Sequence, residues 1–284
     1  MSKKIEIFEM GPRDGLQNEK RQIPTQEKIA LVDLLSKAGF SRIEVASFVS
    51  PKWVPQMADS ADVLAGITRA DGVSYAALTP NMRGYEGARA AKADEIAIFG
   101  SASEGFSKAN INATIAESIE RFKPIAEAAK ADGIPMRGYV SCVTDCPYDG
   151  KVDPSEVARV AELLWQQGCY EISLGDTIGQ GTPETITAML KAVTDVVPAD
   201  KLAGHYHDTA GRACVNIEAS IGEGVRVFDA AVGGLGGCPY APGAAGNVAT
   251  EAVMAHVEAL GYDTGLDHEI IAQAAKMARE MREG

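Results

Sequence analysis

Two histidines one residue apart give the sequence its clearest chemical signal. His205 and His207 lie in residues 202–211, where an apolar run leads into Asp208 and Thr209. Side chains at positions i and i+2 of a β-strand share a face, so both imidazoles are expected to point the same way. Such a pair suits a divalent metal ion. It could also be a hydrogen-bonded pair in a protein core, and the two histidines alone do not decide between these readings.

The residues that follow place the pair within a fold. Asp208 and Thr209 are typical N-cap residues, and residues 210–222 have the pattern of a helix. The histidines would then lie at the carboxyl end of a strand. In parallel α/β folds, catalytic residues gather at that end.

Arg13 and Asp14 form a second chemical pair. The strand-like run 4–10 is broken by Gly11 and Pro12, and the two charged residues follow at once. In an ordinary surface turn they would form an exposed ion pair that contributes little stability. At the catalytic end of a barrel strand they would instead be functional residues.

Glu44 interrupts the apolar run 42–47. A carboxylate at this position either points outward or faces the interior of the fold, where it needs a partner. We expect it to face the interior, with Arg13 or the metal site as its partner.

A glycine-rich segment, residues 232–247, carries Cys238 and Asn247. Its glycines exclude regular structure and predict a mobile loop that could close over a site. A lone Asn247 would be read as a helix cap. Cys238 is flanked by Gly237 and Pro239, so the burial that explains most cysteines explains this one poorly.

The elements that must position these residues follow one pattern along the whole chain. Strand-like runs alternate with helical patterns, which predicts a (β/α)8 TIM barrel, with a doubly wound open sheet as the alternative. An additional C-terminal helix, residues 267–282, should pack outside the barrel and is a candidate surface for a homodimer. The eight strand-like runs are residues 4–10, 42–47, 73–78, 95–99, 136–142, 169–174, 202–207 and 226–231.

Length and composition set further limits. The chain has 284 residues and is 46% hydrophobic, and no linker divides it, so we expect a single catalytic domain over residues 1–284. Neither a membrane span nor a signal-peptide core is recognisable, which predicts a cytoplasmic protein without a membrane partner. The net charge of -12 argues against nucleic acid as a partner.

Four segments closely resemble 3-hydroxy-3-methylglutaryl-CoA (HMG-CoA) lyases of the DRE-TIM metallolyase superfamily. They are residues 11–19 (GPRDGLQNE), 175–179 (GDTIG), 205–209 (HYHDT) and the loop 236–244 (GGCPYAPGA). Isopropylmalate and homocitrate synthases resemble the chain in the Arg-Asp-Gly segment and the His-x-His strand but lack the cysteine loop. That loop therefore favours the lyase.

The resemblance implies a divalent cation held by four residues: Asp14, His205, His207 and Asn247. Nitrogen and oxygen ligands of this kind suit Mg or Mn better than a closed zinc site. The implied reaction splits HMG-CoA into acetoacetate and acetyl-CoA, a step of leucine degradation. His205 or Asp14 would remove the hydroxyl proton, and the residues leave this choice open.

Further roles follow from the same resemblance. Arg13 would contact the substrate and stabilise the enolate, Cys238 would protonate it, and Glu44 completes the catalytic candidates. Lys20 is the first candidate for binding the anionic CoA, because it follows the Arg13 turn. The alternatives are a lyase for another 3-hydroxyacyl-CoA, a Claisen-type synthase, a metal-dependent hydrolase, or a non-catalytic acyl-CoA binding protein.

Overall fold

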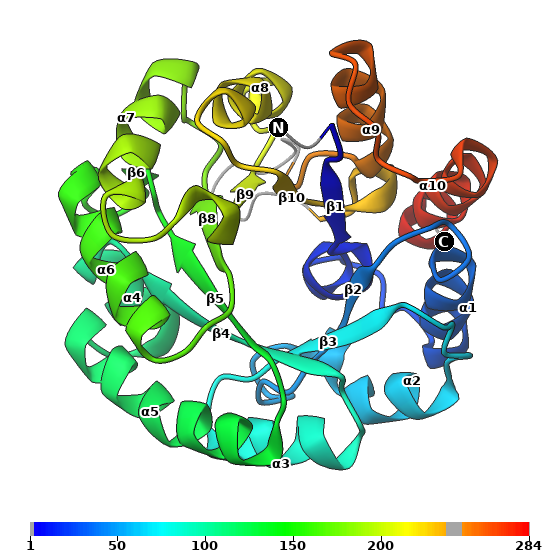
Figure 1. Cartoon of the computed structure of the whole chain (residues 1–284). Coiled ribbons are helices and arrows are strands. Elements are labelled where there is room, and N and C mark those ends of the chain that lie inside the picture. Colours follow the sequence, from blue (N-terminus) through cyan, green and yellow to red (C-terminus); the bar gives the residue numbers. More distant parts are fainter. Residues whose placement is uncertain (1–2, 237–245, 284) are drawn as a thin grey trace.

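The computed structural model describes residues 3–236 and 246–283. Eight parallel strands close into a barrel in the order β1-β10-β9-β8-β5-β4-β3-β2, which confirms the TIM-barrel prediction (Figure 1). Each strand overlaps the run predicted for it. The strands are β1 (Glu6–Glu9), β2 (Arg42–Ser47), β3 (Ser74–Leu78), β4 (Glu95–Ser101), β5 (Met136–Ser141), β8 (Ile172–Asp176), β9 (Leu202–Tyr206) and β10 (Val227–Ala230).

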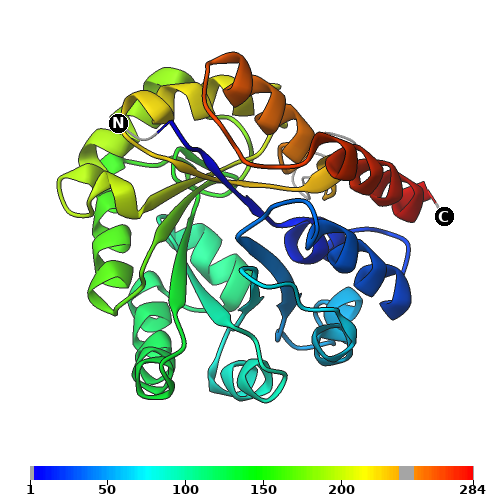
Figure 2. The ribbon, with the colours of Figure 1, turned by 45° about the vertical axis from the view of Figure 1, so that its right-hand side comes forward.

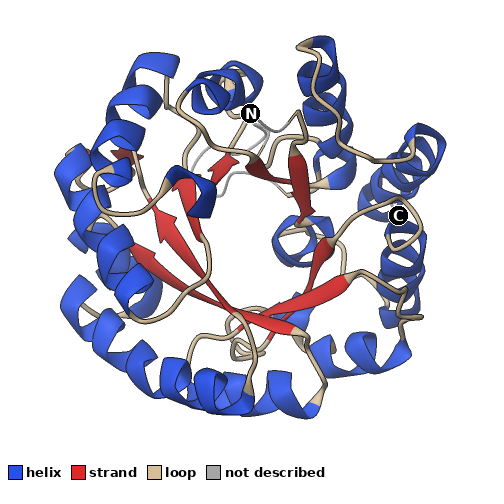
Figure 3. Ribbon diagram, viewed as in Figure 1, coloured by secondary structure: helices blue, strands red, loops and turns tan. Residues whose placement is uncertain are grey.

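Helices surround the barrel as an outer ring (Figure 3). They are α1 (Thr25–Leu35), α2 (Ser60–Gly66), α3 (Met82–Ala90), α4 (Glu104–Ile111), α5 (Ile115–Asp132), α6 (Pro154–Gln166), α7 (Pro183–Thr194), α8 (Ala213–Gly222), α9 (Thr250–Ala259) and α10 (His268–Glu283). The C-terminal helix α10 lies outside the barrel beside α1, as predicted (Figure 2). In the part of the chain that is described, no helix combines the length and apolar character needed to cross a bilayer.

Helix α8 begins later than the sequence predicts. The expected start was residue 210, whereas the first helical residue is Ala213. Asp208 still contributes to this end of the helix, because its Oδ1 accepts a hydrogen bond of 3.0 Å from the Ala213 backbone N–H. A side chain can therefore satisfy a helix N-terminus from further back in the chain than the usual cap position.

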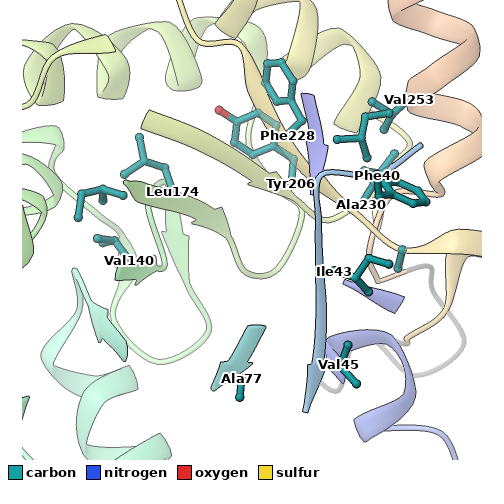
Figure 4. Close-up of a cluster of buried hydrophobic side chains, with 14 of the residues drawn as sticks. Phe40, Ile43, Val45, Ala77, Val140, Leu174, Tyr206, Phe228, Ala230 and Val253 are labelled. Carbon is teal, nitrogen blue, oxygen red and sulfur yellow. The ribbon is translucent and has the colours of Figure 1, made fainter. Parts of the chain in front are cut away.

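The side chains of the barrel strands alternate between two apolar layers. Val140 of β5 and Ala77 of β3 belong to the large core between strands and helices (Figure 4). Their neighbours Tyr139 and Ala76 belong instead to a smaller cluster that also contains Phe8. Successive side chains of a strand point to opposite faces, so this smaller cluster fills the barrel interior.

Charged side chains cross the barrel interior as well. Arg137 is almost fully buried and bonds Asp229 through both terminal nitrogens, at 3.0 and 2.8 Å, and Glu171 through Nε at 2.7 Å. Arg42 bonds Glu171 at 2.9 and 3.2 Å. The guanidinium carbons of both arginines lie within 5 Å of the Phe8 ring centroid, at 4.6 and 4.8 Å. Both arginines therefore have carboxylate partners, which offset the cost of burying their charge.

A short antiparallel hairpin interrupts the barrel pattern after β5. It consists of β6 (Asp145–Cys146) and β7 (Gly150–Lys151), and Gly150 has a φ of +75°, which favours glycine. Strands of two residues are too short to give a periodic signal, so the sequence does not predict them.

Candidate active site

A cavity of about 340 Å³ lies at the carboxyl ends of the barrel strands. Its wall includes five of the residues selected from the sequence, which are Arg13, Asp14, His205, His207 and Asn247. They come from three distant segments of the chain. Closure of the barrel brings these segments together, as the parallel arrangement requires.

A helical turn, η1 (Gly11–Gly15), presents Arg13 and Asp14 to the cavity. Pro12 fixes the backbone angle at the start of the turn. Gly15 is required by close approach, because a Cβ at this position would lie 2.6 Å from the Leu235 side chain. The turn is therefore packed tightly enough to hold both charged side chains in place.

His205 lies near the end of β9 and is oriented by a carboxylate. Its Nδ1 lies 3.1 Å from Asp229 Oδ2, and its Nε2 lies 3.9 Å from Asp14 Oδ2. Asp229 is itself fixed by Arg137 and by a 2.7 Å hydrogen bond from Ser173 Oγ. A carboxylate on one ring nitrogen leaves the other free to bind a metal ion.

His207 carries an unused nitrogen. Its Nδ1 is buried and has no hydrogen-bonding partner among the described residues. Burial and the neighbouring His205 lower the pKa of His207 to about 4, so this imidazole is neutral at pH 7. A neutral imidazole with an unpaired buried nitrogen is what a metal ion would satisfy.

Asn247 and Asp14 complete the polar end of the cavity. Residue 247 forms an antiparallel bridge with His207, and its Nδ2 donates a hydrogen bond of 2.8 Å to Asp14 Oδ2. Burial alone would raise the pKa of Asp14, but Arg13 and the two imidazoles outweigh it and hold the pKa at about 2. Asp14 is therefore ionised at neutral pH.

These contacts fit a divalent cation. One ligand atom each from Asp14, His205 and His207 lie within 4.8 Å of one another. An ionised carboxylate, two imidazoles and a nearby amide form a mixed nitrogen and oxygen donor set.

Glu44 faces the barrel interior and pairs with Arg13, as expected from the sequence. Its other oxygen accepts a 3.0 Å hydrogen bond from Tyr139 Oη, and Arg13 also pairs with Asp14 at 2.6 Å. Burial raises the pKa of Glu44, although Arg13 opposes this shift. The guanidinium of Arg13 is thus held between two carboxylates with little freedom to reorient.

Two sequence predictions are not tested by these contacts. Lys20 is exposed and does not line the cavity, although Gln17 and Asn18 just before it do. Its role in substrate binding stays a prediction. Cys238 lies outside the described residues.

Sequence reasoning missed four polar residues of the barrel interior, which are Arg137, Tyr139, Ser173 and Asp229. Arg137 and Asp229 interrupt apolar strand runs just as Glu44 does. The same signal could have selected them. Their partners, however, lie on other strands and only the closed barrel identifies them.

The Asp229 contact leads to a prediction about metal affinity. Asp229→Asn should weaken Mn²⁺ binding by about 10- to 100-fold, the usual effect of removing the group that orients a histidine ligand. Isothermal titration with Mn²⁺ would measure this change. Ser173→Ala removes one hydrogen bond to Asp229 but keeps the carboxylate, so it should have a smaller effect. Equal affinities in Asp229→Asn and the unmodified protein would contradict the orienting role.

Glu9 offers a prediction about pH. Its fully buried carboxylate accepts hydrogen bonds from Gly11 N (2.7 Å), Val232 N (2.9 Å) and Thr250 Oγ1 (2.6 Å). Burial outweighs these bonds and raises the pKa of Glu9 to about 7. The folded state therefore holds this proton to a higher pH than the unfolded state, and stability contributed by Glu9 falls as pH rises from about 4.5 to about 7.

Glu9→Gln should remove that dependence. We compare the free energy of unfolding of the variant with that of the unmodified protein. Between pH 5 and pH 8, this difference should shift in favour of the variant by up to about 3 kcal/mol. Urea unfolding at both pH values would measure the difference. Parallel stability curves for the two proteins would show that Glu9 does not titrate in this range.

The fold and the cavity together define a class, a TIM barrel with a candidate metal centre at the carboxyl ends of its strands. The family model described as HMGL-like matches residues 4–278. The chain therefore belongs to the HMGL-like family. Membership in this group of metallolyases implies a divalent cation, which agrees with the donor set of the cavity.

Similar proteins agree with this assignment. The chain is 62% identical to an HMG-CoA lyase of known structure from Brucella melitensis, with a TM-score of 0.98 and 99% of both chains covered. It is 55% identical to the 3-hydroxy-3-isohexenylglutaryl-CoA/hydroxy-methylglutaryl-CoA lyase of Pseudomonas aeruginosa, over 97% of this chain and 92% of that protein. An HMG-CoA lyase from Acinetobacter baumannii, solved with coenzyme A and 3-methylmalate, is 37% identical to this chain and has a TM-score of 0.94. The match covers 100% of this chain and 92% of that one. The resemblance inferred from the sequence is confirmed.

Proposed function

We propose that this chain is a divalent-metal-dependent lyase that cleaves HMG-CoA to acetoacetate and acetyl-CoA. One observation carries the proposal: ligand atoms of Asp14, His205 and His207 lie within 4.8 Å of one another. They line a cavity whose wall also includes Arg13. The lyases from Brucella melitensis and Pseudomonas aeruginosa support the same activity through their high identity.

Asp14, His205, His207 and Asn247 would hold the cation, and Mg or Mn suits their oxygen and nitrogen atoms best. A divalent cation bound there supplies positive charge that makes a nearby substrate hydroxyl easier to deprotonate. Asn247 would take part through its amide oxygen.

Removal of the hydroxyl proton would fall to His205 or Asp14. The pKa of Asp14, held at about 2, makes its carboxylate a weak base. For His205, burial opposes protonation, but the Asp229 hydrogen bond and the charges of Asp229 and Asp14 outweigh it and raise the pKa. A base works best when its pKa lies near the working pH. In the cation-bound protein, however, Nδ1 of His205 bonds Asp229 and Nε2 would bind the ion, so this imidazole could accept the proton only after leaving the cation.

Arg13 would stabilise the negative charge that moves onto the thioester as the carbon-carbon bond breaks. Its guanidinium is already fixed by Glu44 and Asp14, so no reorganisation is needed during the reaction. Cys238 would then protonate the enolate carbon and complete acetyl-CoA.

The rest of the cavity suits an acyl-CoA. Besides its polar groups, the wall has apolar side chains, which include Val49, Val54, Leu78, Phe99 and Phe106. Pockets with a few convergent polar groups and an apolar wall are typical of small-molecule sites. The Acinetobacter baumannii complex with coenzyme A supports an acyl-CoA ligand.

An assay with metal-replete protein and HMG-CoA tests the proposal. The expected result is stoichiometric acetoacetate and acetyl-CoA. Condensation of acetyl-CoA with a 2-oxo acid, without cleavage of HMG-CoA, would instead identify a synthase. Binding of HMG-CoA without turnover would identify an acyl-CoA binding protein. Cleavage of another 3-hydroxyacyl-CoA in preference to HMG-CoA would keep the chemistry and change the substrate.

We also propose that residues 1–284 act as one cytoplasmic catalytic domain. Helix α10 lies on the outer surface, so it could form a homodimer contact. Sedimentation velocity would test the dimer.

A further inference from the structure

We propose that the β6–β7 hairpin, through Asp149, positions helix α4 against the cavity and so sets how tightly the acyl-CoA substrate binds. This inference rests on the proposed function. Helix α4 lines the cavity with Phe106 and Asn110, which lie four residues apart and so share one face of the helix. The residues assigned to the cation and to bond cleavage come from other elements, so α4 can affect binding without altering the chemistry.

Asp149 holds the first turn of α4 directly. Its Oδ2 accepts hydrogen bonds of 2.7 Å from Gly105 N and of 2.7 Å from Ser103 Oγ. Ser103 is itself the N-cap of the helix, and its Oγ accepts a 3.1 Å hydrogen bond from Phe106 N. The start of α4 is therefore bound both by its own cap and by a carboxylate from the hairpin. These hydrogen bonds lower the pKa of Asp149 and keep it ionised.

A side chain at position 105 would have to displace the Asp149 carboxylate. A Cβ there would lie 2.3 Å from Asp149 Oδ1. The hairpin and helix also share apolar contacts, because Phe106 packs with Cys146 and its ring centroid lies 6.4 Å from that of Tyr148. The side chain that enters the cavity wall is thus in contact with the hairpin.

The hairpin is in turn fixed to the barrel. Thr144 Oγ1 donates a 3.0 Å hydrogen bond to Asp176 Oδ1 at the end of β8, and Val152 N donates to Thr144 O at 2.9 Å. At the tip, Cys146 Sγ lies 3.3 Å from the backbone nitrogens of Tyr148 and Asp149, which donate to it. The hairpin is thus hydrogen-bonded to the barrel at its base and to itself at its tip. It can therefore fix the position of α4 relative to the barrel.

Asp149→Ala should raise the KM for HMG-CoA about three- to tenfold, the effect of losing a helix cap that also positions a binding wall. The kcat and the affinity for Mn²⁺ should stay within about twofold, since the cation residues are untouched. Amide hydrogen exchange in residues 103–111 should become about tenfold faster. Asp149 is exposed, so its replacement removes no core packing.

Asp153→Ala is a matched control. Asp153 caps α6 with the same kinds of bond, from Ser155 N at 2.8 Å and Ser155 Oγ at 2.7 Å. Helix α6 does not line the cavity, so this variant should keep the normal KM.

Gly105→Ala separates positioning from helix stability. Alanine favours a helix more than glycine, so a purely structural role predicts an unchanged KM. The proposed contact predicts a raised KM, because the new methyl group would displace the Asp149 carboxylate. An unchanged KM in both Asp149→Ala and Gly105→Ala, or unchanged exchange in residues 103–111, would overturn the proposal. If the unmodified protein does not cleave HMG-CoA, the proposed function fails. The hydrogen-exchange rates would still test whether Asp149 of the hairpin stabilises α4.

Discussion

Arg13→Gln is expected to lower kcat for HMG-CoA cleavage by about two to three orders of magnitude. Effects of this size follow the loss of one preorganised group that stabilises a developing negative charge. Glutamine can still donate a hydrogen bond but carries no charge, so it cannot match the guanidinium as the thioester becomes an enolate. Steady-state kinetics with saturating metal would measure the loss.

Metal binding in the same variant separates catalysis from structure. Arg13 pairs with both Asp14 and Glu44, so its removal leaves two carboxylates without that partner. We still expect Mn²⁺ affinity to change by less than about tenfold, because the ligand atoms remain. A variant that loses only thermal stability and keeps a normal kcat would show that Arg13 serves a structural ion pair.

Cys238→Ser should lower kcat by about two to four orders of magnitude, the range for a positioned acid or base. A serine hydroxyl is a much weaker acid than a thiol, so it would protonate the enolate slowly. Metal affinity and the circular dichroism spectrum should stay unchanged. Steady-state production of acetoacetate is the measurement.

Cys214→Ser provides the control for this experiment. Cys214 is a partly exposed free thiol on α8, and it does not line the cavity. Its replacement should leave turnover unchanged. Near-normal turnover in Cys238→Ser would remove that thiol from the mechanism.

The fold could be predicted from the sequence because each barrel strand is a short apolar run followed by a helical pattern. The prediction failed where an element is too short to show a period. The β6–β7 hairpin, with two residues in each strand, is such a case. The start of α8 was also misplaced, because Asp208 bonds the helix from outside the usual cap position.

The candidate site could be predicted in part, for a similar reason. Arg13, Asp14 and the two histidines lie at strand ends, where polar residues after apolar runs are visible in the sequence. The buried residues that orient these side chains could not be identified from the sequence. Asp229 orients His205 only because β10 lies beside β9, and Arg137 reaches Asp229 only across the closed barrel. Contacts of this kind depend on tertiary structure rather than on local pattern.

The central claim is that one divalent cation, held by Asp14, His205 and His207, is required for cleavage of HMG-CoA. The most direct test measures turnover of HMG-CoA after exhaustive chelation and again after Mg²⁺ or Mn²⁺ is added back. The expected result is a nearly complete loss of acetoacetate production that either cation restores. Full turnover in protein shown to be free of metal would contradict the claim.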